Sequence, residues 1–157
     1  MRTPLVVGGL ALVLGVSNVA IVQKERVLAH GTPVLLELAP VDPRSLMQGD
    51  YMRLNYRLPA EVNPYMRRRD GHLVVTLDAK GVAHFVRVHD ATPLRAGEHL
   101  LQYRVRGLRL RIGTDAFYFQ EGTAAKYRGA RYGELRLDGS GGSVLVGLRD
   151  STFKPLR

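Results

Sequence analysis

The chain has 157 residues, 45% of them hydrophobic, and a formal charge of +9. This length is typical of one domain, and the hydrophobic fraction is too high for a disordered chain. The absence of cysteine excludes disulfides, thiolate catalysis and cysteine-ligated zinc or iron–sulfur centres. Arginine supplies 19 of the 23 positive charges. Composition therefore indicates a folded, basic protein and identifies no reaction.

The N-terminal region is strongly apolar. Residues 4–22 carry no charge, and Ser17 and Asn18 are their polar side chains. A helix of this length extends about 28 Å, close to the hydrocarbon thickness of about 30 Å. Because a lone segment in lipid must satisfy its own backbone hydrogen bonds, we predict a transmembrane helix over residues 4–22 that acts as a signal anchor.

Two other interpretations of this segment stay open. A cleaved signal peptide has a shorter apolar core that ends in small residues, and residues 15–17 offer a weak cleavage site. A core helix of a soluble protein normally has a polar stripe, which this segment lacks. Positive charges flank both ends and set no clear orientation. We expect a single-pass protein of the inner (cytoplasmic) membrane, with a juxtamembrane linker at 23–33 and residues 34–157 outside the cytoplasm.

The dominant period after residue 33 is two, which is typical of half-buried strands. Turn residues at 78–81 and 138–142 predict two β-hairpins. The pattern predicts an all-β domain, an antiparallel sandwich or distorted barrel of about eight to nine strands. The predicted strands cover residues 34–38, 51–58, 73–77, 82–88, 101–105, 108–112, 117–119, 135–137 and 144–148. Residues 60–70 and 121–131 are expected to be loops or short helices.

The most distinctive stretch is residues 43–56, PRSLMQGDYMRLNY. Gly49 and Asp50 are suited to a tight turn, since glycine tolerates unusual backbone angles and aspartate bonds nearby N–H groups. Alternation in the following strand directs Met52, Leu54 and Tyr56 to the core. It directs the neighbouring side chains to the other face, namely Tyr51, Arg53, Asn55 and Arg57.

Gly49, Asp50, Tyr51, Leu54 and Tyr56 match the defining positions of the bacterial GDYXXLXY family, which the chain resembles. Residues 39–44, 117–122 and 132–148 are also similar to blocks of that family. The resemblance implies a small membrane-anchored protein whose genes often neighbour those of multi-pass membrane proteins. It implies no established reaction and no catalytic residues, so we assign these five positions a structural role.

A second resemblance concerns residues 45–50, SLMQGD, which are similar to the strand near the nucleophile of type I signal peptidases. The region that would hold the nucleophile, residues 40–43, contains no serine, threonine or cysteine. No lysine lies on a convincing apolar strand, so a Ser–Lys mechanism lacks its base. This resemblance implies structural kinship without peptidase chemistry.

Several arginines are candidates for binding an anion such as a lipid headgroup. The candidates are Arg53 and Arg57 on one strand and Arg104, Arg106, Arg109 and Arg111 on the polar side of two adjacent strands. A further run, residues 67–69, crowds one loop. The alternative interpretation is a solvated polar face in an arginine-rich protein. Nucleic-acid binding is not expected, because the arginines lack an interleaved aromatic platform.

Carboxylates and histidines give weaker candidates. Asp42, Asp50 and Glu121 lie beside turns, where locking the turn is the favoured role. His84 is expected on the apolar face of its strand, with His72 and His89 on the opposite face. Because alternation separates these imidazoles, we expect no metal site and no cofactor.

Three functions follow. The first is a non-catalytic β-domain that is held in the lipid bilayer and acts as an accessory subunit of a multi-pass membrane protein. The second is a membrane-tethered hydrolase using Asp50 and Glu121, assisted by Tyr51 or His84. The third is a module that binds anionic headgroups through the arginine-rich strand face.

Overall fold

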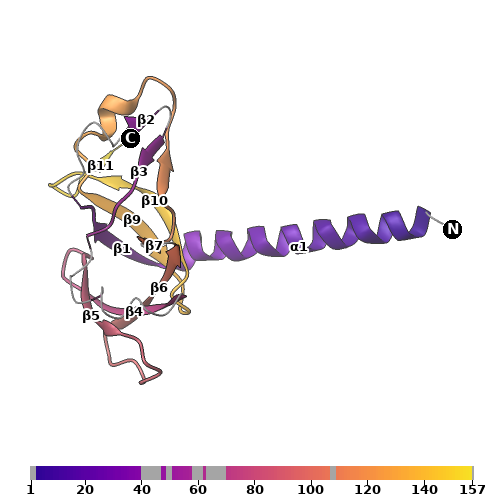
Figure 1. The fold of residues 1–157 in the computed structure, drawn as a ribbon, viewed down its shortest axis with the longest axis horizontal. Helices are drawn as coiled ribbons and strands as arrows, with labels where there is room; N and C mark the ends of the chain where they lie inside the picture. The colour runs from indigo at the N-terminus through magenta and orange to yellow at the C-terminus, as the bar shows by residue number, and fades with distance from the viewer. Residues whose placement is uncertain are drawn as a thin grey trace.

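The computed structural model describes residues 3–39, 47–48, 51–57, 62, 70–106 and 109–156. A long helix, α1 (Thr3–His30), projects from a mainly β domain (Figure 1), which confirms the predicted fold class. One short 3-10 helix, η2 (Ala124–Tyr127), lies in a connection that was expected to hold loops or short helices. The strands are β1 (Thr32–Glu37), β2 (Met47–Gln48), β3 (Tyr51–Arg53), β4 (Asp70–Leu77), β5 (Ala83–Val88), β6 (Glu98–Arg106), β7 (Arg109–Ile112), β8 (Ala116–Tyr118), β9 (Tyr132–Leu137), β10 (Ser143–Arg149) and β11 (Pro155–Leu156).

The helix α1 is long and apolar enough to cross a membrane, and none of its apolar window is buried against the domain. It also corrects one predicted boundary, because residues 23–30 continue the helix where a linker was expected and β1 begins at Thr32. Residues 23–29 contain no glycine or proline and include good helix formers. The helix ends where Gly31 and Pro33 follow.

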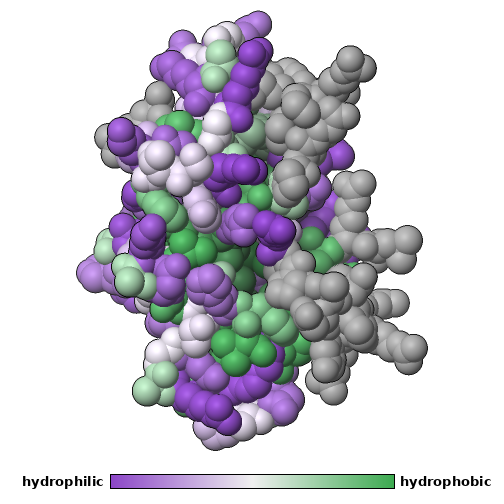
Figure 2. All heavy atoms as spheres, turned by 90° about the vertical axis from the view of Figure 1, so that its left-hand side faces the viewer, coloured by the Kyte–Doolittle hydropathy of each residue, from purple (hydrophilic) through white to green (hydrophobic). Residues whose placement is uncertain are grey.

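Two four-stranded sheets enclose the main core. Their strand orders are β1-β9-β10-β11 and β5-β4-β6-β7, and the pairings between neighbouring strands in both are antiparallel. Val34 and Leu135 from the first sheet pack in one cluster with Leu73, Leu101 and Tyr103 from the second. A third sheet, β2-β3-β8, covers a smaller cluster around Met52, Leu54 and Leu148. The face turned away from α1 is mainly hydrophilic, with hydrophobic residues gathered between the polar ones (Figure 2).

Both predicted hairpins are present, and aspartate shapes their turns. Asp78 and Asp138 each accept two backbone N–H hydrogen bonds through Oδ1, at 2.8–2.9 Å. Gly81 and Gly141 have positive φ angles of 80° and 89°, which the turns require and glycine adopts freely. Asp150 caps a third turn in the same way, from Thr152 and Lys154. These carboxylates act as turn anchors.

The strand β5 departs from the period of two that was expected over residues 82–88. Val74 of β4 pairs with Arg87 and Val75 pairs with Phe85, so Val86 is an extra residue in a β-bulge. Phe85 and Val88 pack on the core, whereas Val86 is exposed. His84 is also exposed, and its Nε2 lies 3.4 Å from Asp78. The expectation of an inward-facing His84 is therefore wrong, because the bulge breaks the period of two.

Candidate functional site: a basic groove at the base of the helix

Arginines of β6 and β7 face one another across the two strands. The antiparallel register places Arg104 opposite Arg111 and Arg106 opposite Arg109. Directly opposed residues have Cβ atoms about 4.5–5.5 Å apart, and like charges there are destabilising. The register therefore brings Arg104 and Arg111 together, in an arrangement that strand stability does not explain.

A groove of about 430 Å³ opens beside these strands. Arg104, Arg106 and Arg111 line it from the sheet, and Lys24 lines it from α1. Its remaining walls are polar residues or glycines: Gln102, Gly113, Thr114, Asp115, Gly142 and Ser143. Among the described residues that line the groove, none has an apolar side chain. The groove is thus suited to a charged ligand and not to a hydrophobic one.

The base of α1 is held firmly against the first sheet, which fixes Lys24 in the groove wall. Arg136 of β9 donates a hydrogen bond from Nη1 to the carbonyl oxygen of Gly31 at 3.2 Å. A Cβ atom at Gly31 would collide with the carbonyl oxygens of Val27 and Leu137. Glycine is therefore required where the helix meets the sheet. Burial raises the pKa of Asp138, in the turn before β10, but hydrogen bonds from Ser140 and Gly142, joined by the charge of Lys24, lower it overall.

The groove is only partly neutralised by carboxylates. Arg111 pairs with Asp115 at 2.6 Å, and Arg106 lies 3.5 Å from Asp70. Within the described part of the chain, Arg104 makes no ion pair, although its strand register places it opposite Asp70. Asp138 acts on Lys24 in addition, so three carboxylates among the described residues stand beside the four cations Lys24, Arg104, Arg106 and Arg111, and Asp115 is the one of the three that lines the groove. A net positive potential follows, which attracts anions.

The other predicted arginines do not join this groove. Arg53 lines a separate hollow of about 250 Å³ with Tyr51 and Tyr118, and this hollow adjoins the groove through Arg111 and Asp115. Arg57 lies apart and pairs with Glu37 at 3.0 Å. Residues 67–69 lie outside the described residues. The predicted arginines therefore do not form one continuous surface, and Arg104 and Arg111 are the opposed pair within the groove.

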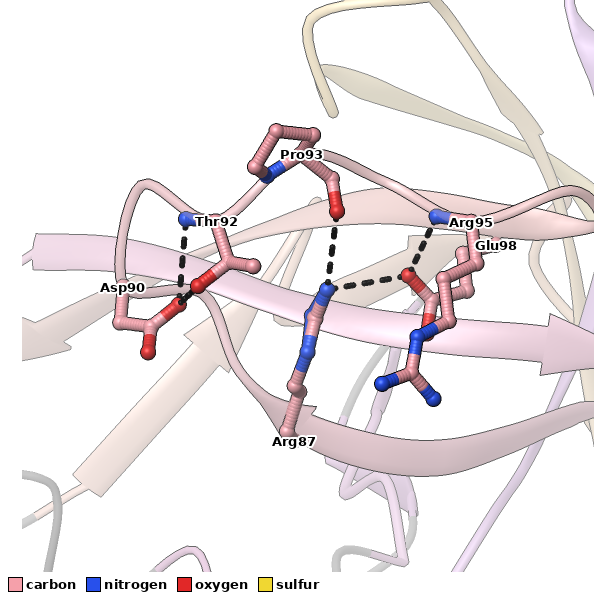
Figure 3. A network of polar contacts seen from close by, with 6 residues as sticks. All are labelled: Arg87, Asp90, Thr92, Pro93, Arg95 and Glu98. Carbon is pink, nitrogen blue, oxygen red and sulfur yellow. Dashed lines mark hydrogen bonds and ion pairs between the residues drawn. The ribbon is translucent and has the colours of Figure 1, made fainter.

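Two arginines elsewhere in the domain, Arg87 and Arg149, are held by carboxylates with little exposure. Arg87 of β5 donates from Nη2 to Glu98 at 3.0 Å, beneath the loop that also carries Asp90 and Thr92 (Figure 3). The same Glu98 oxygen accepts the backbone N–H of Arg95 at 2.9 Å. The Glu98 side chain is only 5% exposed. This network is a structural clamp between β5 and the loop that leads to β6.

The strand β3 and the chain after it have a packing role. Met52 and Leu54 are buried, as alternation predicts, whereas Arg53, Asn55 and Arg57 are exposed. The Tyr56 ring lies against Gly133, where a Cβ atom would stand 3.0 Å from its Cε1. The buried Tyr56 hydroxyl has no hydrogen-bond partner. Burial, and then the charge of Asp115, raises the pKa of Tyr56 above its ordinary value.

Comparison with protein families shows which family the chain belongs to. A model described as GDYXXLXY protein matches residues 13–148. The chain belongs to the GDYXXLXY family. No curated protein and no solved structure matches it. The resemblance to signal peptidases stays a prediction.

The family motif is seen in part. Tyr51 contacts Tyr118 across β3 and β8, with ring centroids 5.7 Å apart, and Leu54 and Tyr56 pack inside the domain. Gly49 and Asp50 lie outside the described residues, as does Asp42. Leu54 and Tyr56 thus lie in the interior, whereas Tyr51 lines the hollow beside Arg53, and the structural role of the five motif positions stays a prediction.

The remaining candidates do not assemble into a catalytic or metal site within the described residues. Glu121 is exposed in a turn. The His72 and His89 rings lie edge to face, with centroids 6.4 Å apart, and no cluster of three or more potential metal ligands occurs in the described part of the chain.

Sequence reasoning missed the contribution of Lys24. Lys24 is one of the positive charges that flank the apolar segment, and this position alone indicates no place in the groove. Its place in the groove depends on the helix continuing to His30, and helix propensity over residues 23–29 was the signal available for this.

Proposed function

We propose that this GDYXXLXY protein is a membrane-anchored, non-catalytic β-domain that serves as an accessory subunit of a multi-pass inner-membrane protein. Its β-domain would lie on the extracytoplasmic side. The observation that supports this proposal is α1, whose apolar window is not buried by any of the residues that the structure describes. Exposed apolar surface on this scale needs lipid or another helix to cover it.

The polar chemistry of the domain supports a non-catalytic role. Hydrogen bonds lower the pKa values of Asp78, Asp90 and Asp150, chiefly those from Val82, Thr92 and Thr152 respectively. A general acid needs the opposite shift, as does the protonated member of a catalytic carboxylate pair. Glu121, which the hydrolase alternative requires, lies exposed in a turn. The carboxylates with shifted pKa values thus support turn geometry.

Site-specific photo-crosslinking in native membranes tests the proposal. A photoreactive side chain is placed in turn at each of residues 10–19 of α1. If the helix packs on a multi-pass protein, adducts with that protein recur every three or four residues, while the intervening positions label lipid. Uniform labelling of lipid at all positions would contradict the proposal. Adducts with a second copy alone would instead assign a homo-oligomer.

The hydrolase alternative has its own test. The test is complementation of a strain that lacks the gene. If these carboxylates were catalytic, neither the Glu121→Gln variant nor the Asp50→Asn variant would restore the phenotype that the unmodified gene restores. We expect full restoration by Glu121→Gln, since its side chain faces solvent.

A further inference from the structure

We propose that the groove formed by Lys24, Arg104, Arg106 and Arg111 binds the phosphate group of an anionic lipid headgroup, in the leaflet where α1 leaves the membrane. The inference rests on the membrane anchoring in the proposed function but not on the multi-pass partner. Its basis is the juxtaposition of a helix lysine with opposed strand arginines in one polar groove.

The first step concerns charge. Arg104 and Arg111 lie directly opposite each other on neighbouring strands. Such pairs repel each other in the absence of a counter-ion. An anion between them converts this repulsion into charge-assisted hydrogen bonds, which planar guanidinium groups form with phosphate in pairs.

The second step concerns the other donors. Thr114 and Ser143 line the groove beside the cations. The Thr114 hydroxyl donates to the carbonyl oxygen of Ala116 at 3.1 Å, so Ser143 is the hydroxyl donor that we assign to the ligand. Gly113 and Gly142 border the same space, so main chain can approach a ligand closely. The groove volume of about 430 Å³ falls within the usual range of ligand pockets, roughly 300–1,000 Å³. A phosphate with an attached polar headgroup fits this chemistry.

The third step concerns depth. Lys24 follows the last apolar residue of the span, Val22, by two positions, which is about 3 Å along a helix. The headgroup layer on each side of the hydrocarbon is roughly 5–7 Å thick, from the total and hydrocarbon thicknesses of a bilayer. Because Lys24 forms one wall of the groove, the groove opens at the level of the lipid phosphates. A lipid headgroup is therefore favoured over a soluble anion.

The test uses the full-length chain reconstituted in nanodiscs of equimolar phosphatidylcholine and phosphatidylglycerol. The lipids that remain bound after mild detergent extraction are counted by native mass spectrometry. We expect phosphatidylglycerol to be retained in preference to phosphatidylcholine. In the double variant Arg104→Gln/Arg111→Gln, this preference is expected to fall by about fivefold for each arginine removed, since one cation near an anionic surface contributes about 1 kcal/mol.

The matched control is Arg128→Gln/Arg131→Gln, which removes the same charge from exposed positions near η2 and β9. This control should keep the preference of the unmodified chain. An equal loss in both double variants would overturn the proposal, since it would show a general charge effect. Equal retention of the two lipids by the unmodified chain would overturn it as well.

A second arm distinguishes the source of the phosphate. The unmodified chain in pure phosphatidylcholine nanodiscs is titrated with inorganic phosphate, and its melting temperature is followed. A lipid-presented site predicts no stabilisation by free phosphate, but stabilisation when phosphatidylglycerol is included. Stabilisation by inorganic phosphate equal to that by phosphatidylglycerol would overturn the lipid assignment. The partner proposal is tested separately, by crosslinking from α1. A groove that fails to bind lipid would therefore overturn the present inference and leave the partner proposal standing.

Discussion

Two groups of arginines in this domain differ in what surrounds them. Arg87 is held by the almost fully buried Glu98, and Arg149 makes two contacts with Glu134, at 2.8 and 3.0 Å. Arg104 and Arg111 face each other instead, with Asp115 as the one carboxylate in the groove wall. The first group joins strands and loops, whereas the second gathers positive charge. The arginines of this domain therefore have two roles, and the position of nearby carboxylates distinguishes the structural arginines from those that form the basic groove.

Removing a carboxylate from the first group should have the largest effect on the stability of the domain. Glu98→Ala removes the acceptor of Arg87 and of the Arg95 N–H, and leaves a largely buried guanidinium without its counter-charge. We expect a loss of about 3 kcal/mol in the free energy of unfolding, as for other buried pairs that lose one partner. Urea unfolding of the chain in nonionic detergent measures it. Glu121→Ala, at an exposed carboxylate, is the control and should change little.

Acid should lower the free energy of unfolding through Asp138, a carboxylate that lies between a turn and the groove lysine. Desolvation raises the pKa of Asp138, but hydrogen bonds from Ser140 and Gly142 and the charge of Lys24 outweigh it, so the net pKa is lowered. The stabilisation is therefore present above the unfolded pKa of about 3.9 and is lost as the pH falls below it. Unfolding measured from pH 6 downwards should show this loss, and Asp138→Asn should show a shallower pH dependence because asparagine does not titrate. Identical slopes in both proteins would refute the assignment.

The smallest effect on stability is expected for substitutions of the groove arginines. In detergent without anionic lipid, Arg104→Gln and Arg111→Gln should each change the free energy of unfolding by no more than about 0.5 kcal/mol. The loss of the exposed Arg111–Asp115 pair is offset by relief of the repulsion between opposed arginines. Thermal unfolding of both variants checks this. A loss as large as that of Glu98→Ala would mean that the groove arginines are structural.

The sequence predicts the elements that depend on local chemistry. The aspartate–glycine turns at 78–81 and 138–142 define both hairpins, and alternation correctly assigns Met52 and Leu54 to the core. It fails at β5, because the bulge at Val86 depends on pairing with β4. It also fails to find the Arg87–Glu98 clamp and the groove position of Lys24. Both require contacts between segments whose arrangement local patterns do not encode.

The unbroken passage from α1 into β1 has a mechanical consequence. Gly31 is the single residue between α1 and β1, and a Cβ atom at this position would collide with two carbonyl oxygens. Helices respond to the thickness of the surrounding bilayer by tilting. If α1 spans the bilayer as we propose, such a tilt would turn the attached domain with it, and membrane composition would then affect the direction in which the domain presents its outer face.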